Sequence, residues 1–166
     1  MGLGYGLLLI SERMNTNDEW YTPPEIIHSL GEFDLDPATS LEAYRLNQSA
    51  KHFYTVRENG LKQEWFGRVW LNPPYSNPLQ EQFLMKMAEH NNGIALVFAK
   101  VEAKWFHHVV FQHAIAIKFL YSRVKFFKPD GTQGLQPRHG SMLVAYGEEN
   151  ARILLSNSLK GKFMFL

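Results

Sequence analysis

The stretch Arg68-Val69-Trp70-Leu71-Asn72-Pro73-Pro74-Tyr75 joins a short apolar run directly to a pair of prolines. The apolar run predicts a buried strand, and the prolines end it because proline has no backbone N–H and fixes φ at about −65°. The segment that leaves the strand is therefore stiff, extended and rich in hydrogen-bond acceptors. Ligands of α/β sheets bind outside the carboxyl ends of strands, so this turn is a candidate site.

The side chains of this turn suit a planar amino group. Such a group could donate one hydrogen to the side-chain oxygen of Asn72 and the other to the carbonyl of Pro73, while Tyr75 offers an aromatic face to an attached base. These two hydrogen bonds draw the nitrogen lone pair out of conjugation, so that it can attack an activated methyl group. The turn therefore indicates a methyl-transfer site. The structural alternative is an ordinary proline turn in which the asparagine caps backbone groups.

The composition predicts a single globular domain. The chain has 166 residues, of which 45% are hydrophobic. This is enough for one hydrophobic core but not for two domains of ordinary size. We expect an irregular arm at residues 1–16 and one domain at residues 17–166. No cysteine is present, so disulfides and thiolate metal sites are excluded. The apolar run at residues 7–10 is too short to span a membrane and has no basic residues before it.

Charge is distributed unevenly along the chain. Residues 1–99 hold seven basic and twelve acidic side chains, whereas residues 100–140 hold seven basic and only two acidic ones. Basic groups interleaved with aromatic rings suit a polyanion with exposed bases, although a solvated basic face is the simpler alternative. The candidate DNA contacts are Lys104, Arg123, Lys125, Lys128 and Arg138, and the basic stretch also contains Lys118.

Apolar periodicity predicts alternating helices and strands. Helices are expected at residues 23–30, with Thr22 as the cap, from Thr39 or Ser40 to Asn47, and at 78–90, 103–112 and 149–159. Strands are expected at residues 33–37, 52–55, 68–71, 94–98, 115–120, 124–127 and 141–146. This order predicts an α/β sandwich with a largely parallel central sheet and a late antiparallel pair. It also places Asp36-Pro37 and Asn72–Tyr75 on one rim of the sheet.

Three stretches taken together resemble the phage Dam-type DNA N-6-adenine-methyltransferase family. They are Trp20-Tyr21-Thr22-Pro23-Pro24, Phe33-Asp34-Leu35-Asp36-Pro37-Ala38 and Gly67–Tyr75, and the resemblance runs from about Asn17 to Gly147. It implies a Rossmann-like methyltransferase sandwich. It also implies S-adenosylmethionine-dependent methylation of the exocyclic N6 of adenine in double-stranded DNA, after the base is flipped out of the helix. The expected location is the cytoplasm of a bacterial host, where protection from restriction is one purpose such methylation could serve.

The resemblance also implies roles for individual residues. Its catalytic positions are Asn72, Pro73, Pro74 and Tyr75, and its cofactor-binding positions are Trp20, Thr22, Pro23, Asp34, Asp36, Pro37 and Asn72. Alternation along a strand directs the two aspartates to opposite faces, and Asp36 at the rim is favoured as the cofactor ligand. Its alternative role is that of a turn carboxylate. The first strand leads into Asp36-Pro37-Ala38 without the glycine-rich loop of many methyltransferases.

Several other functions share these features. A cytosine N4 methyltransferase or a protein-glutamine methyltransferase would present the same turn to the same kind of amino group, and the basic stretch favours DNA over protein as the substrate. A domain of this fold that binds DNA without catalysis is a third alternative. A metal-dependent hydrolase is disfavoured because His107, His108 and His113 do not converge on one helix face, so no metal is expected. The oligomeric state and the DNA recognition sequence stay open, with the segment at residues 128–140 as the candidate for reading sequence.

Overall fold

The computed structural model describes residues 20–134 and 137–166, so the arm expected at residues 1–16 lies outside the described part. Its strands are β1 (Leu35–Asp36), β2 (His52–Phe53), β3 (Val69–Leu71), β4 (Gly93–Phe98), β5 (Ala116–Leu120), β6 (Ser141–Tyr146) and β7 (Gly161–Phe165). Its helices are α2 (Pro24–His28), α3 (Leu41–Asn47), α4 (Leu79–His90), α5 (Phe111–His113), α6 (Glu148–Ser156) and the π-helix η1 (Phe106–Val110). The helix expected at residues 103–112 is thus present but widened by a π-helical segment.

The strands form one seven-stranded sheet in the order β2-β1-β3-β4-β6-β5-β7. Strands β1, β2, β3 and β4 pair in parallel, whereas β6 is antiparallel to both β4 and β5, and β7 is antiparallel to β5. The expected largely parallel sheet with one antiparallel pair is therefore correct only for the first half. Strands β5 and β6 are joined by a loop without a crossover helix, which allows them to pair antiparallel.

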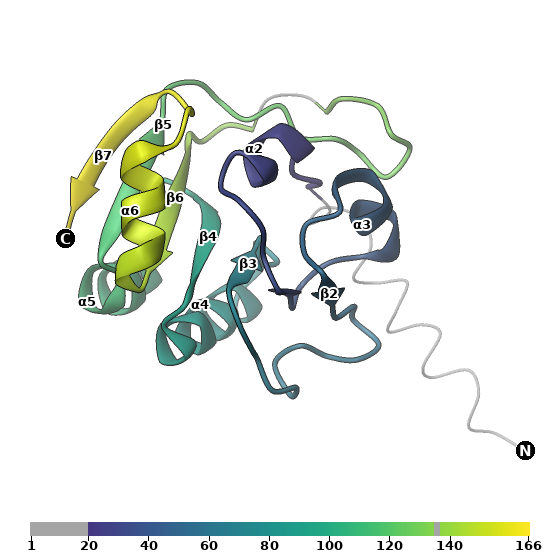
Figure 1. The fold of residues 1–166 in the computed structure, drawn as a ribbon. Coiled ribbons are helices and arrows are strands. Elements are labelled where there is room, and N and C mark those ends of the chain that lie inside the picture. Colours follow the sequence, from purple (N-terminus) through teal and green to yellow (C-terminus); the bar gives the residue numbers. More distant parts are fainter. Residues whose placement is uncertain (1–19, 135–136) are drawn as a thin grey trace, which may run out of the picture.

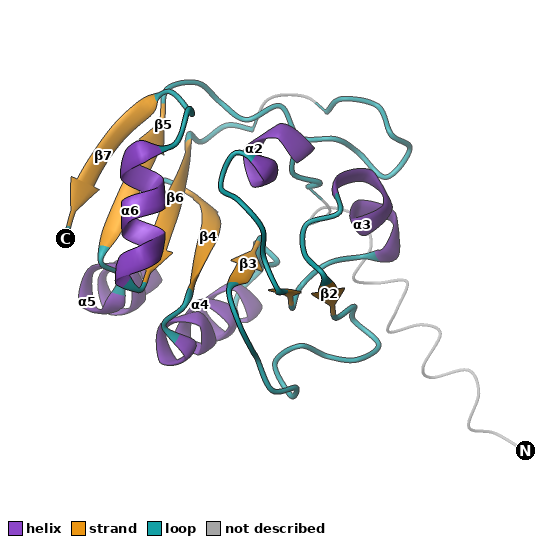
Figure 2. Cartoon of the chain, viewed as in Figure 1, coloured by secondary structure: helices purple, strands orange, loops and turns teal. Residues whose placement is uncertain are grey.

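Helices cover both faces of the sheet (Figure 2). On one face, α4 and η1 pack through Phe83, Met87 and Phe106 against strand residues such as Val97. On the other face, α2 and α6 bury a second set of apolar side chains, which includes Ile27, Trp70, Leu96, Phe98 and Leu154. Strand β4 is buried at every position because its alternate residues belong to the two cores. This burial explains its uninterrupted apolar sequence.

The structure corrects three sequence-based boundaries. Helix α2 begins at Pro24, with Pro23 and not Thr22 at the capping position and no side-chain cap. Residues 124–127 do not form a ladder strand; Val124 and Phe126 are buried as part of a loop, and only Phe127 makes isolated bridges. Burial of alternate residues in a packed loop imitates the period of a strand. Helix α6 ends at Ser156 and not at residue 159, and a short connection leads from it to strand β7.

Candidate active site

Asn72 lies directly after β3, at the carboxyl ends of the parallel strands. Both ends of its side-chain amide make hydrogen bonds. Its Nδ2 donates to the carbonyl of Trp20 at 2.8 Å, and its Oδ1 accepts from the hydroxyl of Tyr75 at 2.8 Å. Because the carbonyl can only accept, it fixes which end of the amide is the donor. The acceptor end of Asn72 therefore faces Tyr75, and the second lone pair of that oxygen is available for another donor.

Aromatic rings surround this amide. The ring of Tyr75 stacks on Phe98 with centroids 4.3 Å apart and planes at 23°. Trp20 meets Phe98 and Phe126 edge-on at 6.4 and 5.6 Å, and His139 tilts against Phe98 at 6.1 Å. The turn at residues 72–75 and the loop after β5 thus share one aromatic cluster, which we call the Phe98 cluster: Trp20, Tyr75, Phe98, Phe126 and His139.

The expected cofactor residues of the N-terminal segment lie beside this cluster. Trp20 reaches Asn72 through its backbone, and Thr22 and Pro23 follow in a buried stretch. The hydroxyl oxygen of Thr22 is buried and has no hydrogen-bond partner among the described residues, and the same is true of Oδ1 of Asn47. The side chain of Asn47 lies beside the backbone of Thr22, because its Nδ2 donates to the carbonyl of Thr22 at 3.3 Å. Each of the two residues therefore has a buried oxygen that could accept a hydrogen bond.

Asp36 ends β1 on the same rim, but its carboxylate is turned inward. It is 3% exposed; Oδ2 accepts a 2.5 Å hydrogen bond from the hydroxyl of Ser49, and Oδ1 accepts from the N–H of Ala38 at 3.2 Å. Burial raises the pKa of Asp36 to about 6, although both hydrogen bonds act in the opposite direction. The bond to Ala38 is that of a turn carboxylate, which was the structural alternative for this residue. Pro37 follows in the turn and is also buried.

This buried carboxyl makes stability depend on pH. Because the pKa is raised above its ordinary value of 3.8, the folded chain holds the proton more tightly than the unfolded chain. The free energy of unfolding should therefore fall as the pH rises from about 4 to 6 and stay lower by about 3 kcal/mol above that range. Asp36→Asn should lack this fall when urea unfolding is measured between pH 4 and 8. The exposed Asp130→Asn is the control and should keep the wild-type fall; identical profiles for the wild type and Asp36→Asn would contradict the prediction.

The structure does not bring Asp34 to this rim. Asp34 precedes β1, where its carboxylate accepts the N–H of Arg68 at 2.8 Å and lies 3.7 Å from Nζ of Lys51. These contacts join the amino ends of β1 and β3, opposite to the end that carries Asn72. Gly67 fits there because it has a φ of +61° and because a Cβ atom at this position would lie 2.4 Å from the Asp34 carboxylate. The surroundings of Asp34 thus account for it as a structural residue.

The loop after β5 is attached beside the turn at residues 72–75. Tyr21 and Phe127 exchange two backbone hydrogen bonds of 3.1 and 2.9 Å, and Phe126 belongs to the Phe98 cluster. In Figure 1 this loop passes over α2. Its basic residues Arg123, Lys125, Lys128 and Arg138 are exposed, as is Lys104 before η1. Four of the five predicted DNA contacts therefore belong to a loop that is fixed next to Trp20.

Lys118 does not belong to this basic surface. Its side chain is buried, and Nζ donates to the carbonyl of Leu154 and to Oδ1 of Asn157. Burial lowers the pKa of this amine. Lys118 therefore anchors the end of α6, and a count of basic residues along the sequence could not reveal this.

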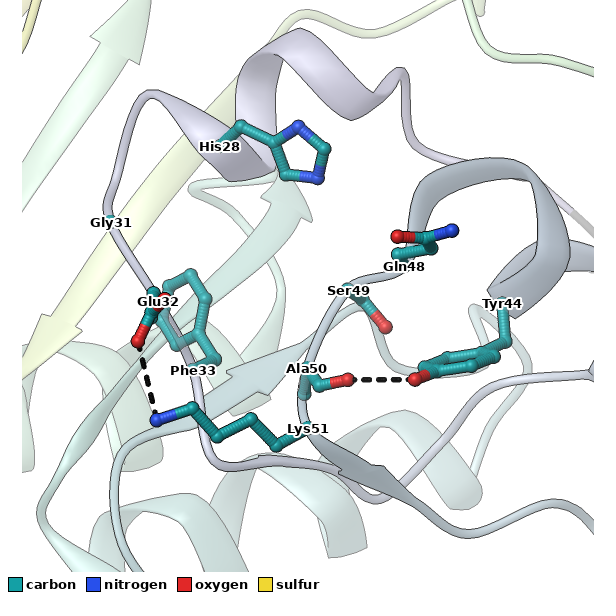
Figure 3. A pocket seen from close by; sticks show the side chains of 9 residues that line it. All are labelled: His28, Gly31, Glu32, Phe33, Tyr44, Gln48, Ser49, Ala50 and Lys51. Carbon is teal, nitrogen blue, oxygen red and sulfur yellow. Dashed lines mark hydrogen bonds and ion pairs between the residues drawn. The ribbon is translucent and has the colours of Figure 1, made fainter.

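Two hollows in the described part of the chain lie away from Asn72. One, of about 410 Å³, is drawn in Figure 3. Its lining residues come before β1 and β2 and from the ends of α2 and α3; they include the ion pair of Lys51 with Glu32 and the hydrogen bond from Tyr44 to the carbonyl of Ala50. The other lies between α6 and the segment before β1. Neither hollow is lined by residues 72–75, where Asn72 and Tyr75 are half-buried.

Within residues 20–134 and 137–166, no three His, Asp or Glu side chains are placed to hold one metal ion. None of the helices in these ranges is both long enough and apolar enough to cross a bilayer.

Sequence reasoning did not single out Phe98 or Asn47 as part of the site. Phe98 is the last residue of β4, which pairs with β3, so a large aromatic residue at the carboxyl end of an expected strand was a usable signal. Asn47 offered no such signal, because it meets Thr22 only through the packing of α3 against the segment before α2.

The chain is thus an α/β protein with a polar site at the carboxyl rim of its sheet, flanked by aromatic rings and a basic loop. The family described as DNA N-6-adenine-methyltransferase (Dam) matches residues 11–162. The chain belongs to this family.

Two phage proteins with the name DNA N-6-adenine-methyltransferase are among its relatives. The protein of Haemophilus phage HP1 (strain HP1c1) is 30% identical over 146 residues, which cover 81% of each chain. The protein of Escherichia phage T1 is 40% identical over 98 residues, which cover 54% of this chain. That alignment spans only 39% of the T1 protein, so the chain matches well under half of this relative.

Proposed function

We propose that this chain is a Rossmann-like, S-adenosylmethionine-dependent methyltransferase that modifies the exocyclic N6 of adenine in DNA. The observation that carries this proposal is the orientation of Asn72. Its donor end is bound to the carbonyl of Trp20, so its other end is the acceptor oxygen, which accepts from the hydroxyl of Tyr75. This is the arrangement that an incoming amino group requires. Family membership and the two phage relatives support adenine as the base.

The chain's own residues would bind and orient the target base. Phe98 stacks on Tyr75 and would hold its ring in place, and an aromatic ring in this position is the kind of surface on which a flipped base stacks. Its amino group would donate to Oδ1 of Asn72 and to the carbonyl of Pro73, which places the nitrogen lone pair outside the ring plane. The hydroxyl of Tyr75 already donates to the Asn72 oxygen, so entry of the base requires this hydroxyl to share or release it.

The residues near Thr22 fit the cofactor. S-adenosylmethionine supplies the activated methyl group when it is bound, and its amino and hydroxyl groups are hydrogen-bond donors. The unpartnered buried oxygens of Thr22 and Asn47 are acceptors of the kind that such donors need. Trp20, Pro23 and Pro37 would shape this site by packing. Asp36 would hold the turn after β1 through Ala38 and Ser49, and the remaining lone pairs of its carboxylate could accept from a cofactor hydroxyl group.

The basic loop would hold the DNA backbone. Lys125 and Lys128 are exposed on the loop that is fixed to Tyr21, so they would lie next to the flipped base. Contacts with phosphate release counterions, which makes the affinity depend on salt. The same loop, which continues to residue 140, is the element proposed to read sequence. Such a reaction would take place in the cytoplasm of a bacterial host cell.

The double variant Lys125→Ala/Lys128→Ala should weaken DNA binding and reduce the slope of log affinity against log salt by about 2, because two phosphate contacts are lost. The measurement is fluorescence anisotropy with duplex DNA at several salt concentrations. Arg152→Ala, on the exposed side of α6, is the matched control and should leave the slope unchanged. An unchanged slope in the double variant would show that the phosphate surface lies elsewhere.

The class of substrate can be tested by incubating the chain with radiolabelled S-adenosylmethionine and either unmethylated duplex DNA or a protein mixture. We expect label in DNA only. Label in protein would favour a glutamine methyltransferase. DNA binding without incorporation of label would favour a non-catalytic domain.

A further inference from the structure

Strand β7 is an edge of the sheet, and no described strand pairs with its outer side. On its inner side, the N–H of Tyr121 donates to the carbonyl of Lys160 at 3.0 Å and the N–H of Leu166 donates to the carbonyl of Ile115 at 2.9 Å. Bonded residues alternate along an antiparallel ladder, so the N–H and C=O groups of Gly161, Phe163 and Phe165 point outward. This edge presents an unpaired row of donors and acceptors.

The side chains along this edge are unusually apolar for a surface. Met164, Phe165 and Leu166 are 46%, 63% and 43% exposed, and Leu155 on α6 is 56% exposed. In Figure 1 this strand forms the margin of the sheet next to α6. Natural edge strands are normally protected by charges, prolines or bulges, and within β7 only Lys162 serves that purpose. Apolar residues along an open edge mark an interaction surface.

We propose that β7 pairs antiparallel with β7 of a second copy of this chain, which joins the two sheets into one. A two-fold axis at Phe163, the middle residue of the strand, pairs every residue from Gly161 to Phe165. The outward groups of Phe163 then bond to those of Phe163 in the second copy, and Gly161 bonds to Phe165. Both copies thus contribute the same strand to the interface, as two-fold symmetry requires.

The side chains agree with this register. Phe165 of one copy lies opposite Gly161 of the other, where an aromatic ring covers a strand glycine. Gly161 cannot carry a side chain of its own, because a Cβ atom would lie 2.1 Å from the carbonyl of Phe119. Lys162 lies opposite Met164, so no like charges face each other directly.

Charges at the two ends of the strand are complementary. Lys160 and Lys162 lie at its beginning, whereas Glu148 and Glu149 begin α6 near its other end. Ala145 near the end of β6 pairs with Ala116, and Ala116 pairs with Phe165. The start of α6, which follows β6, therefore lies at the same end of the sheet as Phe165. The two-fold axis brings the basic end of each strand to the acidic end of the other copy. A second copy of this chain therefore matches the edge in hydrogen bonding and in charge.

The mass in solution tests this pairing. Sedimentation velocity of the full chain, at micromolar concentrations, should give a dimer of the 19.2 kDa chain. Phe165→Pro removes one outward N–H from each copy without breaking the ladder to β5, and should raise the dimer dissociation constant at least about tenfold. Phe165→Val keeps the N–H and should remain dimeric. A monomeric wild type, or a Phe165→Pro variant as dimeric as the wild type, would overturn the proposal.

Cross-linking tests the register separately. The chain contains no cysteine, so a single introduced cysteine can form only an intermolecular disulfide. Under mild oxidation Phe163→Cys should cross-link, because the two Cα atoms would lie about 5.5 Å apart. Met164→Cys should not, because the same atoms would be more than about 7 Å apart. The reverse pattern would overturn this register. Neither test requires methyltransferase activity, so failure of the proposed function would leave this result unaffected.

Discussion

Asn72→Ala is expected to lower the turnover of methyl transfer to DNA by about 100- to 1000-fold. The variant loses the acceptor that holds the amino group of the base, and loss of one preorganised polar contact to the reacting group commonly has an effect of this size. It also loses the bond to the carbonyl of Trp20 that sets the direction of the acceptor. The measurement is single-turnover incorporation of labelled methyl groups, with cofactor affinity measured separately by calorimetry.

Two companion variants sharpen this prediction. Asn72→Asp keeps an acceptor oxygen but sets the second carboxylate oxygen against the carbonyl of Trp20, so it should not restore turnover. Ser76→Ala, an exposed position in the same turn, should leave turnover unchanged. Cofactor affinity should stay within a few-fold of wild type in all three variants. Wild-type turnover in Asn72→Ala would remove this residue from its proposed role.

Phe98→Ala is expected to lower the free energy of unfolding by about 3–5 kcal/mol, which is the usual cost of removing a buried phenylalanine ring. Phe98 is only 7% exposed and contacts the rings of Tyr75, Trp20 and Phe126. Its loss leaves a cavity and removes the support of Tyr75, so methyl transfer should decline as well. Urea unfolding followed by tryptophan fluorescence measures the loss of stability.

The control for this variant is Phe66→Ala. Phe66 is 43% exposed, and its ring meets His52 edge-on at 5.4 Å. Because much more of its surface is exposed than that of Phe98, its removal should cost less, about 1 kcal/mol. Equal losses in the two variants would contradict the assignment of Phe98 as the central residue of the aromatic cluster.

The parallel half of the fold could be predicted from the sequence because its signals are local. Val69–Leu71 is an apolar run followed by a proline turn, Gly93–Phe98 is one preceded by two asparagines, and both are strands in the structure. The directions of β6 and β7 depend on pairings between distant segments, and no local pattern encodes them. Polar and apolar residues alternate only weakly along β7, because it is an edge strand with little burial.

The candidate site was predicted in part for the same reason. Asn72 and Tyr75 are three residues apart, so their cooperation could be inferred from the motif, and their hydrogen bond confirms that they lie together. The contact of Asn72 with Trp20 spans 52 residues and depends on the folded chain. The inward turn of Asp36 toward Ser49 could not be predicted either, because a carboxylate before a proline gives no sign of which face it takes.

The most direct test of the central claim is nucleoside analysis of unmethylated DNA after incubation with S-adenosylmethionine and either the wild-type chain or Asn72→Ala. The proposed role of Asn72 predicts N6-methyladenine with the wild type, none above background with the variant, and no N4-methylcytosine with either. Methylcytosine as the product, or equal N6-methyladenine from both proteins, would contradict it.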